Sequence, residues 1–338
     1  MKKFKLGCFA LLSSFVAAVA EDSLTIYSQR HYPADKKVFA DFTEQTGVKI
    51  NVVKGSADEL IQRLKSEGEA SPADILLTKD AARIYWATEE GLLQDAGSEV
   101  LKKQVPDYLR DPEGRWVAMT QRARVIVYSK ERVKQGEIST YADLAKPEWK
   151  GRVLVRSSAN IYNQSLLSSL ISTTGEKEAL LWAVQVRKNM ARPPQGSDRD
   201  QIRAVAAGLG DVALVNSYYL GLLVNSDNPA DREVAAKVAI CYPDQGEKGR
   251  GAHMNISAAG VVKHAKNKAN AVKFLEFLTA KEAQTYYPQA TYEYPLSLEL
   301  TTPLHKSWGE FKHDTLHLSE LGKYNADAIK IFQAAQWE

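Results

Sequence analysis

The stretch that organises the predicted fold reads Asp-Val-Ala-Leu-Val-Asn-Ser-Tyr-Tyr-Leu over residues 211–220. Its first half is a strand-like apolar run, and a second apolar run, residues 220–224, follows the two tyrosines. Because successive side chains of a strand point to opposite faces, Tyr218 and Tyr219 can reach one ligand only where the backbone bends. A strand that passes into a helix provides such a bend. The alternative is that one ring belongs to the core and the other is half exposed.

The first hundred residues alternate between strand and helix patterns joined by short connections. The expected elements are a strand at 24–27, a helix at 34–46, a strand at 49–53, a helix opened by a capping box at 56–59, a strand at 74–77 and a helix from Asp80 to Gly91. This order predicts a mainly parallel, doubly wound sheet. A second series begins with a strand at 153–155 and a helix at 162–172, and residues 227–231 are expected to form a polar loop.

Two longer strand patterns, residues 116–129 and 255–262, suit segments that cross from one lobe to another. The predicted fold class is therefore α/β, with two doubly wound lobes joined by two crossing strands. Ligands of such sheets bind at the carboxyl ends of the strands, here in a cleft between the lobes. The predicted division is a signal peptide at 1–20, lobe one at 21–120 plus 245–296, and lobe two at 121–244 plus 297–338.

The amino terminus has the pattern of a secretory signal peptide. Lysines at positions 2, 3 and 5 precede an apolar run over 6–16, and Ala18-Val19-Ala20 is a small-x-small cleavage site. Cleavage there removes three lysines and no acid, which leaves 41 Lys and Arg residues against 41 Asp and Glu. The basic excess of the precursor is therefore no evidence for a nucleic-acid partner, and none is expected.

Cleavage also removes Cys8 and leaves Cys241 alone. No internal disulfide is then possible, so an exported chain of this length must rely on a sizeable core. A metal site made of several cysteines is excluded as well. Any metal would be held by oxygen or imidazole nitrogen.

Five residues follow predicted strands on their carboxyl side: His31, Tyr32, Tyr162, Tyr218 and Tyr219. Phenolates are hard anionic donors suited to a small, highly charged cation such as ferric ion. A free tyrosine titrates near ~10, so only a strongly Lewis-acidic metal would deprotonate several at neutral pH. One imidazole would complete five-coordination without adding charge. Each of these residues, taken singly, is as readily explained by core packing or helix capping.

Four phenolates on Fe(III) give a centre with one net negative charge, which requires a nearby cation. Arg122 and Arg124, on the first crossing segment, are the candidates, since arginine stays charged in any environment. His253, near the second crossing strand, is a weaker candidate for the cleft. Residues 158–160 precede a predicted helix and either hold an anion on its free N–H groups or cap it. Tyr286 is expected in a helix core, and Tyr287, Tyr292 and Tyr294 in loops.

Two other readings stay open on the residues alone. The tyrosines could line an aromatic pocket for a polyamine or a sugar. The chain could also be an exported enzyme, although it contains neither a G-x-S-x-G element nor an H-E-x-x-H helix.

The sequence resembles the periplasmic ferric-ion-binding proteins of bacterial iron ABC transporters over nearly the whole mature chain. The Asn-Ser-Tyr-Tyr element at 216–219 is the most specific part of this resemblance; the other parts are residues 26–32, 122–128, 143–151, 253–257 and 261–265. The resemblance implies a class II periplasmic binding protein fold with Fe(III) bound in the cleft. It also implies a monomer in the periplasm that delivers iron to an inner-membrane ABC permease and its ATPase.

The same resemblance assigns expected roles to the site residues. Tyr162, Tyr218 and Tyr219 match the family's ligand tyrosines, and His31 and Tyr32 match the His-Tyr ligand pair of one branch. Arg122 looks like the arginine that supports the ligands in that branch. In another branch a synergistic carbonate or phosphate lies near a helix N-terminus and an asparagine that matches Asn216. On that pattern, Ser158, Asn160 and Asn216 are the candidates for holding such an anion, and Tyr32, which adds a fourth phenolate, is the alternative to an external anion.

Overall fold

The computed structural model describes residues 22–30 and 32–338. The predicted signal peptide and the candidate ligand His31 lie outside these described residues. Within them, no helix combines the length and the apolar character that crossing a membrane requires.

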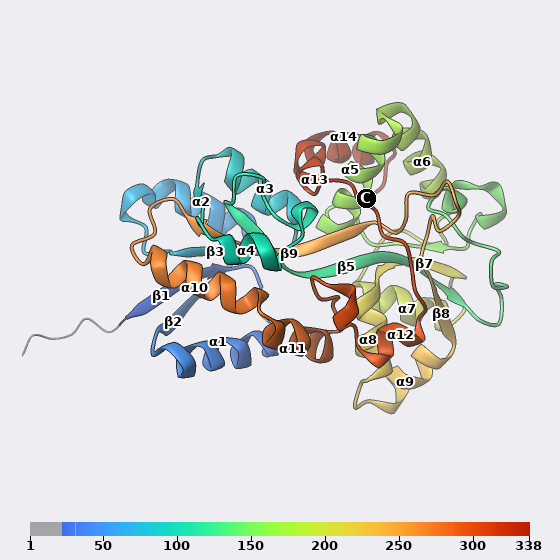
Figure 1. Ribbon diagram of the computed structural model, residues 1–338. Coiled ribbons are helices and arrows are strands. Elements are labelled where there is room, and N and C mark those ends of the chain that lie inside the picture. The colour runs from blue at the N-terminus through green and yellow to red at the C-terminus, as the bar shows by residue number, and fades with distance from the viewer. Residues whose placement is uncertain (1–21, 31) are drawn as a thin grey trace, which may run out of the picture.

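One end of the molecule is built from the alternating elements that the sequence predicts (Figure 1). They are β1 (Ser23–Ser28), α1 (Pro33–Thr46), β2 (Lys49–Lys54), α2 (Ala57–Glu67), β3 (Ile75–Thr78) and α3 (Ala81–Glu89). Strand β1 pairs in parallel with both β2 and β3. The predicted capping box is confirmed, since Ser56 accepts from the Glu59 amide and Glu59 accepts from the Ser56 amide. The Asp80 side chain caps α3.

Two strands, β5 (Trp116–Ser129) and β9 (Met254–Val262), run between the two ends of the molecule, as predicted (Figure 1). They pair with each other in antiparallel fashion, because β5 leaves the first lobe and β9 returns to it. The strand order is β2-β1-β3-β9-β5-β7-β6, with β4 paired to β9 and β8 to β5. The pairs made by β9 with β3 and by β5 with β7 are also antiparallel, so the sheet is less parallel than the strand and helix order predicts.

The other end of the molecule repeats the layered arrangement with its own elements. They are β6 (Val153–Leu154), α5 (Ile161–Thr174), α6 (Glu176–Asn189), α7 (Asp198–Ala206), β7 (Val212–Asn216), α8 (Ser217–Val224), α9 (Pro229–Ala236) and β8 (Val238–Cys241). The predicted loop at residues 227–231 is wrong from Pro229 onward. Asn228 caps α9 by accepting from the Ala230 amide, and Pro229 has the fixed φ that a first helical turn needs.

The remaining segments are helical or short. They are β4 (Leu93–Gln94), α4 (Glu99–Gln104), α10 (Lys268–Thr279), α11 (Lys281–Thr291), α12 (Pro303–Ser307), α13 (Ser319–Lys323) and α14 (Asn325–Ala334). Tyr287 belongs to α11 and is fully buried, so its placement in a loop is wrong.

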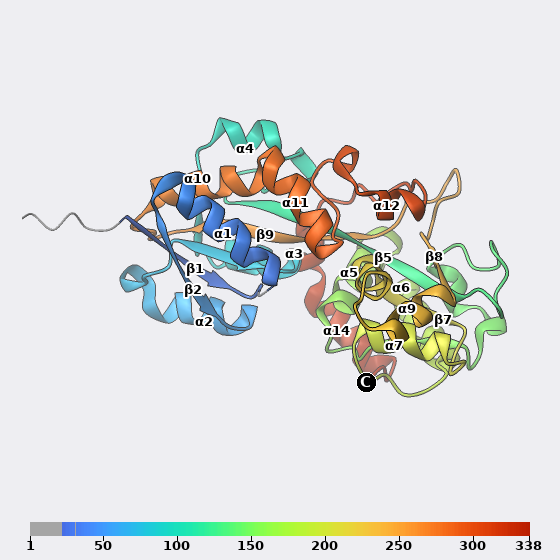
Figure 2. The same ribbon diagram turned by 90° about the horizontal axis from the view of Figure 1, so that it is seen from below.

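Separate hydrophobic cores lie at the two ends, and Figure 2 shows a group of helices at each end. The first core includes Ile26, Leu76 and Ile256, and the second end contains cores around Leu166 and around Val215. The two-lobed α/β fold class is therefore confirmed. The exact division of the chain between the lobes stays a prediction.

Candidate metal centre

The backbone bends where the two neighbouring tyrosines lie. Strand β7 ends at Asn216, and α8 begins at the next residue, Ser217. Asn216 itself is still extended, with φ −84° and ψ 139°. The rings of Tyr218 and Tyr219 are consequently on one side of the chain, with centroids 4.2 Å apart. The predicted bend between strand and helix is confirmed.

Tyr162 approaches this pair from the first turn of α5. Asn160 caps the helix by accepting from the Tyr162 amide at 3.2 Å. The hydroxyl oxygens of Tyr162 and Tyr218 are 3.5 Å apart, and both side chains are buried. Two phenol oxygens from separate helices therefore converge on one point.

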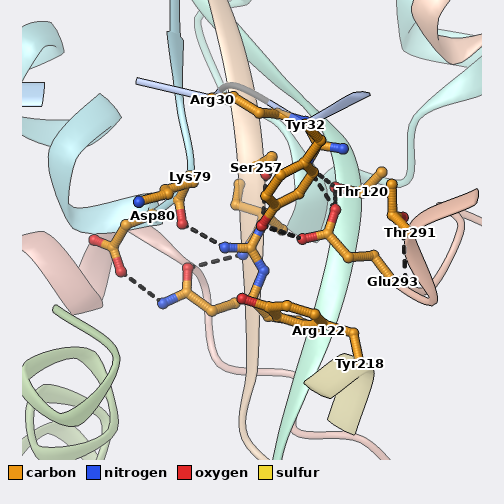
Figure 3. A network of polar contacts seen from close by, with 12 residues as sticks. Arg30, Tyr32, Lys79, Asp80, Thr120, Arg122, Tyr218, Ser257, Thr291 and Glu293 are labelled. Carbon is orange, nitrogen blue, oxygen red and sulfur yellow. Dashed lines mark hydrogen bonds and ion pairs between the residues drawn. The ribbon is translucent and has the colours of Figure 1, made fainter. Parts of the chain in front are cut away.

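Tyr32 approaches from the first lobe, at the residue that precedes α1. Its hydroxyl donates to Glu293 at 3.4 Å, and the Arg30 guanidinium lies 4.3 Å from its ring centroid. In Figure 3 the side chains of Tyr32 and Tyr218 both point toward Arg122. The structure thus brings four of the five predicted ligands toward one place, while His31 is outside the described residues.

Burial raises the pKa of each of these phenols above that of free tyrosine. For Tyr219 the pKa is raised to about 12, first by burial and then by the neighbouring Tyr162 phenol. The pKa values of Tyr162 and Tyr218 are also raised by burial, and the nearby Arg122 charge opposes the shift at both. In the metal-free protein the phenols are therefore neutral, and a bound cation must displace their protons.

Arg122 is fully buried beneath the tyrosines. Its guanidinium lies 5.7 Å from the ring centroid of Tyr162 and 6.0 Å from that of Tyr218. It donates to the Lys79 carbonyl and to the Ser257 hydroxyl, and it forms an ion pair with Glu293 at 3.1 Å. Of the two arginines that the sequence offered, this one faces the phenols.

Arg124 is turned to other partners in the second lobe. Its guanidinium pairs with Asp198 at 2.9 Å and donates to the side-chain oxygens of Asn163 and Asn216. The Asn216 side-chain oxygen therefore already accepts a hydrogen bond within the protein. The side-chain nitrogen of Asn216 is buried and has no hydrogen-bond partner.

A pocket of about 410 Å³ adjoins Tyr162 and Tyr219 at the start of α5. Its lining comes from both lobes and includes two cations, Lys79 and Arg156. Asn160 lines this pocket, whereas Ser158 is not among the lining residues and accepts from Gln164 through its carbonyl. The pocket therefore combines cations with a helix N-terminus, which suits a small anion.

Glu293 is the residue of this region that sequence reasoning missed. It is fully buried, accepts from Thr120 at 2.7 Å, and pairs with Arg30 at 2.6 Å as well as with Arg122. It follows α11 in a polar stretch with no motif, so no local signal identifies it. Glu293 is identified only by its contacts with segments that are far away in the chain (Figure 3).

His253 does not lie with the tyrosines of the candidate site. It lines a small cavity with Tyr108, Asp314 and several leucines, and its Nε2 has no partner. Within residues 22–30 and 32–338, no group of three or more His, Cys, Asp or Glu side chains could hold a metal ion.

Comparisons with known proteins agree with this geometry. The model of the bacterial extracellular solute-binding protein family matches residues 25–285. Iron uptake protein A1 of Synechocystis sp. is 49% identical over 321 residues, which cover 94% of this chain and 88% of that protein. The chain therefore belongs to the bacterial extracellular solute-binding protein family.

Solved structures give the same result. A Trichodesmium protein in complex with iron and citrate ligands has a TM-score of 0.89 and 47% identity, covering 94% of this chain and all of that one. The ferric binding protein from Campylobacter jejuni has a TM-score of 0.88 and 40% identity, covering 93% of this chain and all of its own. The resemblance to ferric-ion-binding members of the family is confirmed.

Proposed function

We propose that this protein captures Fe(III) in the cleft between its lobes and delivers it to an inner-membrane ABC permease and its ATPase. The proposed ligands are the phenolates of Tyr32, Tyr162, Tyr218 and Tyr219 and the imidazole of His31. The observation that carries the proposal is the 3.5 Å approach of the Tyr162 and Tyr218 hydroxyls, beside Tyr219 and above Arg122. The names of the relatives, an iron uptake protein and a ferric binding protein, support it.

The signal-peptide pattern and a relative from Serratia marcescens, an Fe(3+)-binding periplasmic protein, support a periplasmic location. We infer a monomeric binding protein with no nucleic-acid partner and no catalytic role, because the family is one of solute-binding proteins. One chain supplies all the proposed ligands.

A synergistic carbonate or phosphate would be held in the pocket beside Tyr162 and Tyr219. Arg156 and the N-terminus of α5 supply positive charge there, and Asn160 lies at its edge. The Trichodesmium relative was solved with citrate as well as iron, which supports the same expectation. Asn216 would act through Arg124, which its side chain contacts.

A polyamine is a poorer ligand for this cleft. Aromatic faces attract cationic amines, but two carboxylates that act on the phenols, Glu293 and Asp198, are each already paired with two arginines. The positive groups around the pocket would instead repel a polyamine.

The experiment that tests the proposal is the visible spectrum of the protein after loading with Fe(III). Phenolate-to-iron charge transfer should colour the protein, and Tyr219→Phe should weaken or shift the band. Tyr324→Phe, in the turn before α14, is the matched control and should leave the band unchanged. A colourless wild-type protein with no ferric affinity would contradict the proposal.

A further inference from the structure

The charge of Arg122 is already balanced inside the protein. Arg30 and Arg122 share the Glu293 carboxylate, at 2.6 Å and 3.1 Å, and Arg30 also pairs with Asp35 at 3.0 Å. All four side chains are buried, so two guanidinium groups are matched by two carboxylates. Figure 3 shows Glu293 with the two arginines. This cluster has no net charge, so Arg122 cannot by itself offset an anionic metal centre.

The arginines of the second lobe are engaged in a similar way. Arg124 and Arg156 both contact the Asp198 carboxylate, at 2.9 Å and 3.4 Å. Arg124 is held further by Asn163 and Asn216, and none of these three residues lines the pocket. One carboxylate therefore offsets part of this positive charge as well.

Lys79 differs from these arginines. Its ammonium group forms no ion pair with any residue in the described part of the chain. The adjacent Asp80 gives its carboxylate oxygens to Ala82, Ser165 and Asn255. Lys79 immediately follows β3, is half-buried, and lines the pocket together with Tyr162 and Tyr219. It is the cation of the first lobe that faces ligands of the second.

The surroundings of Lys79 also disfavour its charged, ammonium form. Burial lowers the pKa of Lys79, and repulsion from Arg122 and Arg156 lowers it further, while the opposing attractions of Asp80 and Glu293 are smaller. A cation in such a place gains stability when an anion arrives. The proposed ferric centre, with four phenolates, is such an anion.

We propose that Lys79 is a positioning residue of the metal centre, which supplies the positive charge that the ferric–phenolate complex requires when the lobes close. This inference rests on the proposed function. Lys79, in place of Arg122, then neutralises the centre. Arg122 holds the Lys79 carbonyl through a hydrogen bond and lies against the rings of Tyr162 and Tyr218. Lys79 itself donates no bond to the iron.

The size of the expected effect follows from Coulomb's law. A unit charge within about 10 Å of the centre, at an effective dielectric constant of ~20, would change the affinity by roughly tenfold or more. Removing the charge should therefore weaken ferric binding measurably. Lys79→Arg, which moves the charge slightly on a longer side chain, should leave ferric binding nearly unchanged.

The test compares wild type with Lys79→Gln, Lys79→Arg and the control Lys54→Gln, an exposed lysine at the end of β2. Each protein is loaded with Fe(III), and the dissociation constant is measured by competition with a chelator at one fixed pH. We expect Lys79→Gln to weaken binding about tenfold or more, with Lys79→Arg and Lys54→Gln close to wild type. The charge-transfer maximum should stay in place in all four proteins, since the ligand atoms are unchanged.

Three results would overturn the inference while leaving the ferric-binding function intact. They are wild-type affinity in Lys79→Gln, an equal loss in Lys79→Arg and Lys79→Gln, and a shift of the band like that expected for Tyr219→Phe. A wild-type protein that binds no ferric ion would instead contradict the proposed function itself.

Discussion

The Ser165 hydroxyl donates to the Asp80 carboxylate at 2.7 Å, and this bond joins the two lobes. Ser165 lies in α5, one turn after Tyr162, while Asp80 caps α3 in the first lobe. Asn255 of the crossing strand β9 donates to the same carboxylate oxygen at 2.8 Å. The helix that carries a proposed ligand is therefore tied to the opposite lobe through a fully buried carboxylate.

Ser165→Ala should loosen this tie. A buried carboxylate that loses a donor keeps its desolvation cost, so we expect a loss of about 1–3 kcal/mol from the closed arrangement of the lobes. Iron should then dissociate faster, which stopped-flow mixing with a chelator would measure. Ser168→Ala is the matched control, because the Ser168 hydroxyl bonds only the Gln164 carbonyl within the same helix. Equal dissociation rates in the two variants would show that the bond does not hold the lobes together.

Glu293→Gln should destabilise the fold strongly. The substitution leaves the buried Arg30 and Arg122 with one carboxylate, Asp35, between them. Breaking a buried ion pair on one side typically costs about 3–5 kcal/mol. Urea unfolding would measure the change, with the exposed Glu299→Gln as control. A variant as stable as that control would mean that the arginines find water or other partners when Glu293 is neutral.

The strands and helices of the fold could largely be predicted, because their signals are local. The capping box at Ser56, the cap at Asp80 and the apolar runs of the two crossing strands each specify an element within a few residues. Helix α9 was missed because Asn228 and Pro229, read as turn residues, are also a helix start.

The tyrosines of the site could be predicted because each follows a strand. Their electrostatic partners could not. Glu293 meets Arg30 across 263 positions of sequence and Thr120 across 173, and no pattern in the chain marks such pairs. For the same reason the charge argument alone offered both Arg122 and Arg124, whereas the family resemblance favoured Arg122, and the contacts in the structure agree with Arg122.

His253 should make the fold sensitive to acid. Burial, and then the charges of Arg250 and Arg124, lower the pKa of its imidazole well below the ordinary value of 6.5. The unfolded chain therefore binds a proton first as the pH falls. The contribution of His253 is fully present above pH ~6.5 and decreases below it, by up to about 1.4 kcal/mol per pH unit.

His253→Gln should remove that part of the pH dependence. Free energies of unfolding, measured in urea between pH 7 and pH 5, should fall less steeply with acidification in this variant, by up to about one bound proton. His264→Gln, in the turn after β9, is the control histidine. If the slope for His253→Gln equals that of wild type, the imidazole takes up its proton in the folded state without penalty.

Gly221→Ala should disturb the helix that holds both neighbouring tyrosines. A Cβ at Gly221 would lie 2.6 Å from the Tyr292 Cβ and 2.8 Å from its Cγ, so Tyr292 must move. Tyr292 ends α11 in a left-handed conformation, with φ 59°, which leaves its backbone little freedom. Alanine usually stabilises a helix by up to about 1 kcal/mol relative to glycine, but overpacking costs about 1–3 kcal/mol, so the expected sign is a loss.

The displacement of α8 should also appear in metal binding, because Tyr218 and Tyr219 occupy its first turn. We expect Gly221→Ala to weaken ferric affinity in chelator competition and to lower the free energy of unfolding together. Gly246→Ala is the matched control, since a Cβ there meets no atom within 4 Å. If Gly221→Ala loses stability but keeps its affinity, Tyr292 has moved and α8 has not. If it matches Gly246→Ala in both measurements, the close approach of α8 to Tyr292 places no constraint on the site.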